Sequence, residues 1–333
     1  MGRPEENDAS AAVPFGYPPA VLAEPPRVAA VCHMFHPEVA GEALARLRNI
    51  PFPADVFVST DTEEKRAALA ALFASWGQGT AEVRVVPNRG RDIAPKLVGF
   101  REVHDRYDRV LHLHSKRSKH ADFLQPWRAY LYETLLGSPA VVRSVFEAFE
   151  RLPRLGMVAP QHFEPVRRWL DWSGNFGAAR ALAARMGIGL RPDAALDFPS
   201  GSMFWARPAA LRPLLDLGLS FDDFPEEAGQ VDGTPAHAIE RLYFHVCERA
   251  GYSWMKVADP ALLFDTRAVV RIGSPEDLVR FAAERGAALA SGALPKRAEA
   301  PPMMVQTPPG LLLRSAPALP ATQAGPEQAR EAA

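Results

Sequence analysis

Val28-Ala-Ala-Val-Cys-His-Met-Phe35 is an almost wholly apolar run, and the fold class follows from what surrounds it. A short apolar run of this kind is typical of a buried strand. After Pro37, residues 38–48 carry apolar side chains at helical spacing, which predicts a helix. A strand followed closely by a helix is the repeating unit of α/β folds.

The alternation continues through the first part of the chain. Further strands are predicted at 55–59, 82–86 and 109–114, and helices at 63–76 and 95–107. This order predicts an α/β domain with a mainly parallel central sheet flanked by helices. The second half is less regular, with predicted strands at 156–160 and 203–206 and predicted helices at 129–136, 139–152, 178–186, 208–217 and 234–251.

Composition excludes several classes of protein. The 333 residues carry 38 Lys and Arg against 39 Asp and Glu, a net charge of −1, which argues against a globally basic nucleic-acid binder. The two cysteines, Cys32 and Cys247, are too few for a disulfide framework or a cysteine-based zinc site. Both lie in apolar surroundings, so we expect small buried side chains in a reducing compartment.

Proline content suggests where the folded domain begins and ends. The chain has 32 prolines, and they are enriched at 1–27 and 286–333 in polar, alanine-rich surroundings. We therefore expect disordered tails on both sides of a single domain at 28–285. No apolar run approaches the roughly 20 residues of a membrane span, and acidic residues precede the first apolar stretch, unlike in a secretory signal. The sequence thus predicts a cytoplasmic protein, with at most peripheral association at the inner face of a membrane.

Polar segments follow the predicted strands at 59–63, 88–92 and 114–119. In an open parallel sheet, ligands bind at the carboxyl ends of the strands. These segments are therefore expected to meet at one edge of the sheet and to form a ligand site.

The segment Asn88-Arg-Gly-Arg-Asp92 has the composition of a phosphate-binding turn. Gly90 allows a tight turn, and the guanidinium groups of Arg89 and Arg91 can each pair with phosphate. Asp92 can orient an arginine or accept a hydrogen bond from a sugar hydroxyl. The alternative is a polar turn closed by an Arg91–Asp92 salt bridge.

The segment His112-Leu-His-Ser-Lys-Arg117 combines imidazoles with basic side chains. His112 and His114 are two residues apart in a strand, so they lie on one face and could hold a metal ion. Lys116 and Arg117 form a local basic cluster suited to phosphate. The alternative is a solvated basic loop after an interior strand.

Two later segments complete the candidate site. In Ser200-Gly-Ser-Met-Phe-Trp205, Gly201 between Ser200 and Ser202 suits close approach of the backbone to a ligand, and Trp205 could stack on a sugar ring. Met203 and Phe204 could equally belong to the core.

The last segment lies on and before the helix predicted at 234–251. Asp232 precedes this helix and Glu240 lies within its apolar face, so both are candidates for a general base. Acids at such positions can also be capping residues or surface residues. His237 lies on the same helix. Together with the segment 200–205, it is predicted to bind the acceptor or the sugar.

The order and spacing of four motifs resemble the rhamnan synthesis protein F family of bacterial polysaccharide biosynthesis. The resemblance covers roughly 28–260 and rests on the segments 88–95, 111–117, 200–205 and 232–242. It implies an inverting glycosyltransferase built on a single A-type, Rossmann-like nucleotide-sugar domain. The implied partners are a nucleotide-diphosphate sugar and a glycan or lipid-linked acceptor, with peripheral association with membrane biosynthetic machinery.

The resemblance also implies roles for individual residues. Asp61 would lie near the nucleoside, and Asn88, Arg89 and Gly90 would line the nucleotide. Where such enzymes carry a metal-binding Asp-x-Asp, this chain reads His112-Leu-His114, so a divalent ion (Mn or Mg) is not expected to be essential.

The diphosphate would instead be neutralised by Lys116 and Arg117. Counting back from Gly251-Tyr252 places Glu240 at the catalytic base, with Asp232 as the second candidate.

The expected function is transfer of a sugar from the nucleotide-diphosphate donor to a growing bacterial surface polysaccharide or lipopolysaccharide. Rhamnose is the first candidate for this sugar. The alternative is a non-catalytic glycan-binding or scaffolding module on a degenerate transferase fold. A third possibility, phosphate-ester hydrolysis through His114, lacks a nucleophile motif.

Overall fold

The computed structural model describes residues 8–20, 24–115, 124, 126–193, 195–227, 229, 232–263 and 268–290. Lys116 and Arg117 lie outside the described residues, so their predicted contact with a diphosphate stays a prediction.

A nine-stranded sheet runs through the described part of the chain in the order β4-β3-β2-β5-β7-β6-β8-β1-β9. Strand β7 is antiparallel to its neighbours β5 and β6, and the other neighbouring strands are parallel. The strands are β1 Ser10–Ala12, β2 Val28–His33, β3 Ala54–Thr60, β4 Ala81–Val85, β5 Arg109–His114, β6 Leu155–Pro160, β7 Phe204–Ala206, β8 Ser253–Ala258 and β9 Val269–Val270.

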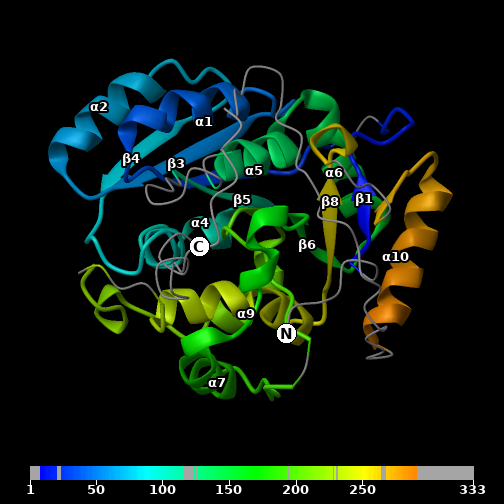
Figure 1. Cartoon of the computed structure of the whole chain (residues 1–333). Coiled ribbons are helices and arrows are strands. Elements are labelled where there is room, and N and C mark those ends of the chain that lie inside the picture. Colours follow the sequence, from blue (N-terminus) through cyan, green and yellow to red (C-terminus); the bar gives the residue numbers. More distant parts are fainter. Residues whose placement is uncertain are drawn as a thin grey trace, which may run out of the picture.

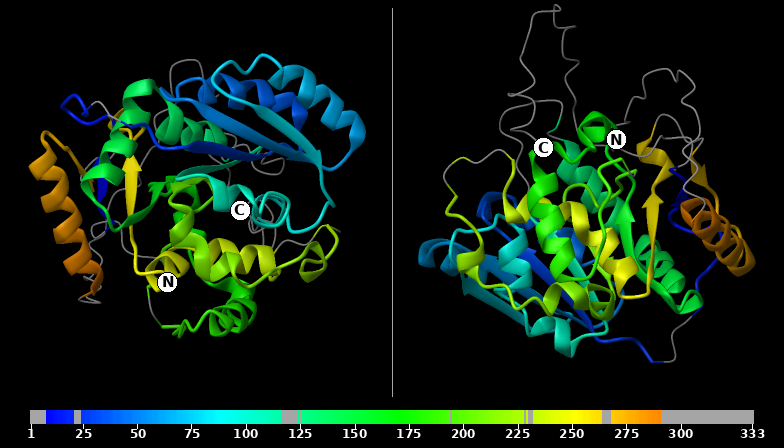
Figure 2. Two further views of the ribbon diagram at one scale, coloured as in Figure 1. Left: turned by 180° about the vertical axis from the view of Figure 1, so that it is seen from behind. Right: turned by 90° about the horizontal axis from the view of Figure 1, so that it is seen from below.

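Helices cover both faces of this sheet (Figures 1 and 2). One layer contains α1, α2, α5, α6 and α10, and the other contains α3, α4, α7, α8 and α9. The α-helices are α1 Ala40–Leu47, α2 Glu63–Phe73, α3 Ile93–Leu97, α4 Val103–Arg106, α5 Pro126–Leu136, α6 Pro139–Arg151, α7 Phe176–Arg185, α8 Arg212–Leu215, α9 Pro235–Arg249 and α10 Pro275–Ala290.

The apolar run at 28–35 explains this layering. Successive side chains of a strand point to opposite faces. In β2, Val28, Ala30 and Cys32 pack into the core under α1 and α2, whereas Ala29 and Val31 pack into the core on the other side. A strand buried on both faces must be apolar at every position, which is why the run has no polar–apolar alternation.

The predicted α/β class with a mainly parallel sheet flanked by helices is confirmed. One predicted helix is wrong in extent, because residues 95–107 are divided between the short helices α3 and α4. Gly99 lies between them, and glycine weakens a helix interior. Strand β8 and helix α10 were not anticipated from the sequence.

The first residues described are packed, contrary to the tail expected over 1–27. Strand β1 pairs with both β8 and β9, and Ala11 and Val13 are fully buried. The sequence was misleading because a strand of three small residues lacks a periodic signal and its partners are far along the chain. At the other boundary, α10 extends to Ala290, and residues 291–333 lie outside the described part. None of the helices in the described ranges is long and apolar enough to cross a membrane.

Candidate functional site

A pocket of about 320 Å³ lies at the carboxyl ends of β2 and β5. Strands β3 and β4 extend the sheet on one side of β2, and β5 extends it on the other, so the strand order reverses between β2 and β5. Ligands of open parallel sheets bind at such a reversal point. The volume is within the range of roughly 300–1,000 Å³ found for small-molecule sites.

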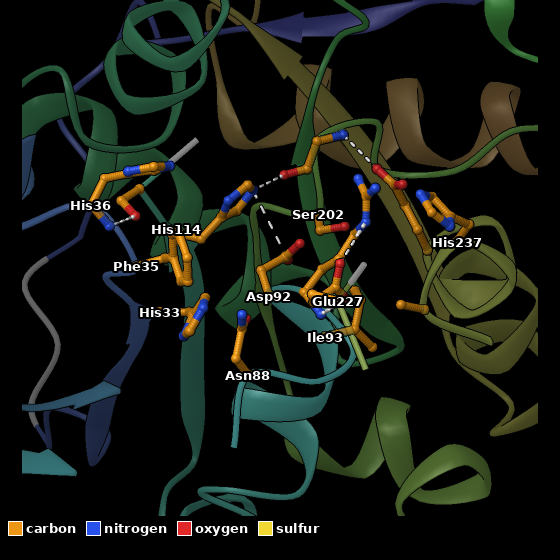
Figure 3. Close-up of a pocket in the computed structure, with 15 residues that line it drawn as sticks. His33, Phe35, His36, Asn88, Asp92, Ile93, His114, Ser202, Glu227 and His237 are labelled. Carbon is orange, nitrogen blue, oxygen red and sulfur yellow. Dashed lines mark hydrogen bonds and ion pairs between the residues drawn. The ribbon is translucent and has the colours of Figure 1, made fainter. Parts of the chain in front are cut away.

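The pocket wall comes from five separate segments of the chain (Figure 3). They follow β2, β4 and β5, form the turn before β7, and include α9 with the residues that precede it. The lining residues are His33, Phe35, His36, Asn88, Arg91, Asp92, Ile93, His114, Ser115, Gly201, Ser202, Glu227, Ala236, His237 and Glu240.

Two imidazoles form the floor at the strand ends. His33 and His114 are register partners in the neighbouring strands β2 and β5. His33 Nδ1 lies 3.0 Å from Ser59 Oγ, and burial lowers the pKa of His33 to about 3. His114 Nε2 lies 2.8 Å from the carbonyl oxygen of Gly201, which can only accept, so Nε2 carries a proton. His33 is thus neutral at neutral pH and brings no charge to the pocket.

A buried ammonium group fixes the start of α3. Lys96 is fully buried, and its Nζ donates to Asp92 Oδ2 at 2.7 Å and to the carbonyl oxygen of Ser202 at 2.8 Å. Burial opposes ionisation of Asp92, but His114 and Lys96 outweigh it and hold the pKa of this carboxyl well below its usual range. Lys96 was not predicted as a site residue. Its four-residue spacing from Asp92 was the available sequence signal.

The turn at 88–92 is divided between the pocket and the surface. Asn88, Arg91 and Asp92 line the pocket. Arg89 instead pairs with Glu226 at 2.7 Å and does not line the pocket. Gly90 has a φ of +70°, and a Cβ there would lie 2.6 Å from the Cβ of Ala94, so the turn requires glycine.

The turn before β7 brings backbone groups into the pocket. Gly201 has a φ of +89° and Ser202 a φ of +52°. The N–H of Gly201 donates to Glu240 Oε1 at 2.8 Å, which ties this turn to α9. Close approach of the backbone was predicted here, and Gly201 and Ser202 both line the pocket.

Trp205 does not have the predicted role. It is fully buried on the opposite face of the sheet, where its ring packs against Phe146 at a centroid distance of 5.1 Å. The expectation that Trp205 stacks on a sugar is therefore wrong. Side chains alternate along a strand, so a residue one position past Phe204 faces away from the pocket side.

Helix α9 carries two polar side chains into the pocket. His237 and Glu240 are three residues apart and therefore lie on one face of the helix. His237 Nδ1 lies 2.8 Å from Thr234 Oγ1, and its buried Nε2 has no hydrogen-bond partner among the described residues. Burial, with the charge of Arg91, lowers the pKa of His237 to about 4.

Asp232, the second candidate for a base, is held outside this pocket. Its Oδ1 accepts a hydrogen bond of 2.5 Å from Asn175 Nδ2, and Arg241 approaches it at 4.0 Å. Asp61 does not line this pocket either. It pairs with Lys65 at 2.6 Å, and the Lys65 ammonium lies 3.9 Å from the ring centroid of Phe35, a residue of the pocket wall.

His112 and His114 lie on one face of β5, as predicted, but in different surroundings. His112 Nε2 lies 3.0 Å from His104 Nε2, in a fully buried position outside the pocket lining. Burial holds the pKa of His112 well below its usual value. The two imidazoles are therefore not presented together as ligands for one ion.

Comparison with known proteins places the chain in a family. The family model for rhamnan synthesis protein F matches residues 17–252. The chain belongs to this family. The resemblance inferred from the motifs is thereby confirmed, and membership indicates a role in polysaccharide synthesis. The matched region includes every residue that lines the pocket.

Two curated relatives come from Xanthomonas campestris pv. campestris. The chain is 39% identical over 219 residues to the uncharacterized protein WxcX of strain B100, and the match covers 65% of this chain and 31% of that protein. The protein of the same name from strain ATCC 33913 gives the same figures. The match thus spans about a third of the length of these relatives.

A second cavity of about 40 Å³ adjoins the first in this member of the rhamnan synthesis protein F family. The two cavities share His237 and Glu240 in their walls. The second cavity is lined by Trp127, Val166, Trp169, Leu170, Ser173, Phe198, Ser200, Asp232, His237, Glu240 and Arg241. Asp232 and Ser200 are therefore predicted site residues that line the second cavity rather than the first.

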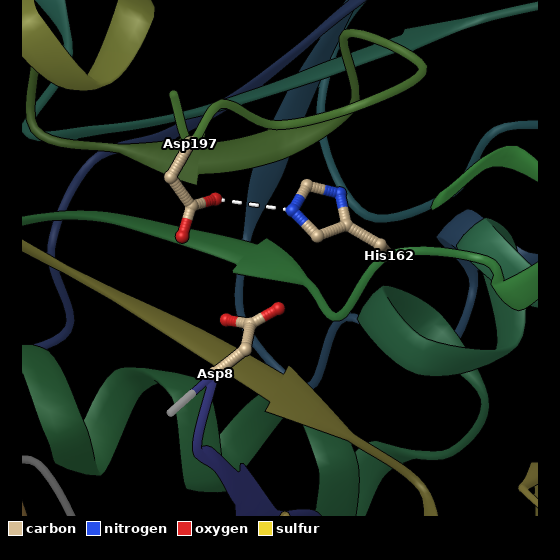
Figure 4. Close-up of side chains that lie close together, drawn as sticks. All are labelled: Asp8, His162 and Asp197. Carbon is tan, nitrogen blue, oxygen red and sulfur yellow. Dashed lines mark hydrogen bonds and ion pairs between the residues drawn. The ribbon is translucent and has the colours of Figure 1, made fainter. Parts of the chain in front are cut away.

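A buried cluster of charges lies behind the turn that carries Gly201. Asp8, His162 and Asp197 bring one potential metal-ligand atom each within 4.8 Å of one another (Figure 4). The ammonium of Lys256 contacts Asp8 and lies 2.9 Å from Asp197. Arg167 also pairs with Asp8, at 3.1 Å. Two cations of the protein thus already balance the two carboxylates, so we interpret the cluster as an ion-pair network rather than a metal site.

This ion-pair network reaches the functional site through one imidazole. His162 Nε2 lies 3.1 Å from Asp197 Oδ1, and His162 Nδ1 lies 2.9 Å from Ser200 Oγ. Burial lowers the pKa of His162 to about 4. The network therefore anchors the turn that presents Gly201 and Ser202 to the pocket. Its members are too far apart in the sequence for any motif to reveal them.

Proposed function

We propose that the protein is an inverting glycosyltransferase that binds a nucleotide-diphosphate sugar in the larger pocket. The observation that carries the proposal is the position of this pocket, at the reversal point of a parallel sheet, opposite a helix bearing His237 and Glu240. The family name favours a rhamnosyl donor. The acceptor would be a hydroxyl of a growing or lipid-linked glycan.

The donor would lie across the strand ends. Phe35 is a partly exposed aromatic side chain in the wall and offers a face for the nucleobase. Arg91 also lines the pocket, and its partly exposed guanidinium can pair with phosphate oxygens. Lys96 cannot turn to the diphosphate without leaving Asp92 and the Ser202 carbonyl. Lys116 and Arg117, which follow β5, are proposed to supply the remaining positive charge.

Glu240 is the preferred base because it lines the pocket, whereas Asp232 lines the second cavity alone. The hydrogen bond from the Gly201 N–H holds Glu240 Oε1 in a defined position. In the proposed step the acceptor oxygen attacks the anomeric carbon and gives its proton to Glu240. The bond from that carbon to the diphosphate breaks, and the diphosphate leaves with the electron pair. Fixed cations beside the leaving group favour this transition state.

A divalent ion does not fit the place where related enzymes carry Asp-x-Asp. His112 is hydrogen-bonded to His104 in the core, and His114 Nε2 faces the Gly201 carbonyl. Imidazoles are also poor ligands for magnesium. We therefore assign no step to a metal, and we expect activity to persist in the presence of a chelator.

The test of this proposal is whether the protein hydrolyses the nucleotide-sugar donor when no acceptor is present. Purified protein is incubated with nucleoside diphosphates and their sugar conjugates, and both the melting temperature and the release of nucleoside diphosphate are measured. We expect one conjugate to raise the melting temperature and to be hydrolysed slowly. If no conjugate stabilises the protein and none is hydrolysed, the proposal is wrong.

A non-catalytic glycan-binding or scaffolding module is the second candidate. It is favoured by the hydrogen bonds that the pocket carboxylates already accept within the protein, Asp92 from Lys96 Nζ and Glu240 from the Gly201 N–H. Such a module would bind a sugar ligand and show no donor hydrolysis, so the same experiment separates the two functions.

A further inference from the structure

We propose that the second cavity, between Trp169 and His237, is the subsite for the terminal sugar of the acceptor glycan. This inference rests on the proposed function, because it assigns the partner of the donor in the same reaction. It is carried by the shared wall of the two cavities, by the chemistry of the lining, and by one buried imidazole nitrogen.

The shared wall places the two substrates where transfer requires them. His237 and Glu240 line both cavities. On the turn before β7, Ser200 lines the second cavity and its neighbour Gly201 lines the first. A hydroxyl entering from the second cavity therefore meets the proposed base before it meets the donor. Holding two reactants next to each other in the right orientation lowers the barrier to their reaction.

The lining of the second cavity suits a sugar. Pyranose rings have C–H faces that pack on aromatic rings and hydroxyl edges that exchange hydrogen bonds with charged side chains. Trp169 is half-buried in the 3₁₀ helix Glu164–Trp169, and Phe198 adds a second aromatic wall. Asp232 and Arg241 add a carboxylate and a guanidinium group to the lining of the same cavity.

His237 provides the observation that points to a bound hydroxyl. The residue is 6% exposed, and its Nε2 has no hydrogen-bond partner among the described residues. A buried polar atom without a partner carries a free-energy cost, which a ligand hydroxyl would remove. Thr234 Oγ1 holds the other ring nitrogen and so fixes the orientation of the imidazole.

The size of the cavity limits what enters it. Its volume of about 40 Å³ has room for a few water-sized groups. We therefore assign to it the edge of the sugar that bears the attacking hydroxyl, with the face of the ring against Trp169. The preceding sugars of the glycan would extend outward past this residue.

The first experiment measures binding of a simple acceptor probe without any donor. Saturation-transfer NMR is recorded for methyl α-L-rhamnopyranoside with the wild-type protein, Trp169→Ala, Trp169→Phe and Trp172→Phe. Trp172 is three residues further on, packs against Phe176 and lines neither cavity, so it is the matched control. We expect the signal to be lost in Trp169→Ala, weakened in Trp169→Phe and retained in Trp172→Phe.

Equal signals in the wild type and Trp169→Ala would overturn the subsite, as would the absence of any signal in the wild type at millimolar probe. Neither outcome concerns donor hydrolysis, so the proposed function would stand or fall separately.

The second experiment uses the transfer reaction. Trp169→Ala is expected to raise the KM for the acceptor at least tenfold and to leave the rate of acceptor-free donor hydrolysis unchanged. His237→Gln is expected to lower kcat of transfer more than donor hydrolysis. A uniform fall of both rates in both variants would assign these residues to the fold and contradict the proposal.

Discussion

Two clusters of acidic and imidazole side chains flank the turn before β7, and they differ in what their charges contact. In the buried network, Lys256 lies between Asp8 and Asp197, and both of these carboxylates are nearly or fully buried. In the pocket, Lys96 holds Asp92, but Glu240 and His237 face open cavities.

The comparison shows that an altered pKa does not by itself mark a functional site. Burial lowers the pKa of His162 in the network and that of His237 in the pocket to about 4. His162 has a partner on each ring nitrogen, whereas His237 Nε2 has none among the residues described. We therefore expect His237, which lines a cavity, to contribute to function, and His162, which has a partner on both ring nitrogens, to contribute to stability.

The largest expected effect concerns the buried network. Lys256→Met leaves Asp8 and Asp197 buried without their shared cation, so we expect the free energy of unfolding to fall by about 3–5 kcal/mol. Urea denaturation measures this change. The matched control is Arg191→Met, which removes an exposed pair with Asp193 and should cost less than about 1 kcal/mol. Equal losses in the two variants would show that the buried network contributes no more to stability than an exposed ion pair.

The second prediction tests the open cluster through its proposed base. Glu240→Gln keeps the shape of the side chain but cannot accept a proton. General-base catalysis contributes roughly 10²–10⁴-fold, so turnover should fall by at least about 100-fold while donor affinity stays the same. Asp232→Asn, in the second cavity, is the comparison variant. If Glu240→Gln retains most of its turnover and Asp232→Asn does not, the base is Asp232. If both variants remain active, the transferase mechanism fails.

The third prediction concerns charge in the pocket. Arg91→Ala should weaken binding of a nucleotide-diphosphate sugar by about 1.5–3 kcal/mol, the usual value of a charge-assisted hydrogen bond. The melting temperature should hardly change, because the side chain is partly exposed. Arg89→Ala is the control, since Arg89 pairs with Glu226 away from the lining. Isothermal titration would contradict the assignment if Arg89→Ala had the larger effect.

The last prediction concerns the pH dependence of stability. Burial lowers the pKa of His33 to about 3 and those of His104, His162 and His237 to about 4. Between these values and about 6.5 the unfolded chain binds more protons, so stability is fully present above pH 6.5 and is lost as the pH falls. Melting temperatures between pH 7.5 and 4.5 measure this loss. His162→Gln should flatten the slope, and a slope as steep as that of the wild type would argue against the neutral buried state.

The sequence predicted the first half of the fold better than the second. Strands β2 to β5 alternate with helices, and each strand is followed by a polar segment, so local pattern alone places the pocket. Beyond β5 the sheet depends on pairing between distant segments, such as Ala11 with Val257. Neither the three-residue β1 nor the contacts that bury it leave a periodic signal.

The site was predicted unevenly for the same reason. Gly201, His237 and Glu240 were predicted from their local sequence context, and all three line the pocket. Trp205 was wrongly predicted to contact a sugar, because the face to which a strand residue points depends on strand register, and a short motif does not specify the register.

Residues missed in the sequence have ordinary local surroundings. Beyond its local ion pair with Asp92, Lys96 reaches the site through a tertiary contact with the Ser202 carbonyl, and Glu227 does so through the Arg91 N–H.

The position of β1 also bears on the order of events during synthesis. Of the nine strands described, β1 is the first to leave the ribosome, yet its two neighbours in the sheet, β8 and β9, are the last. The segment must therefore stay unpaired while the rest of the domain is translated, and non-local pairing of this kind slows folding. Strand β1 can therefore take its place in the sheet only after β8 and β9 have been synthesised.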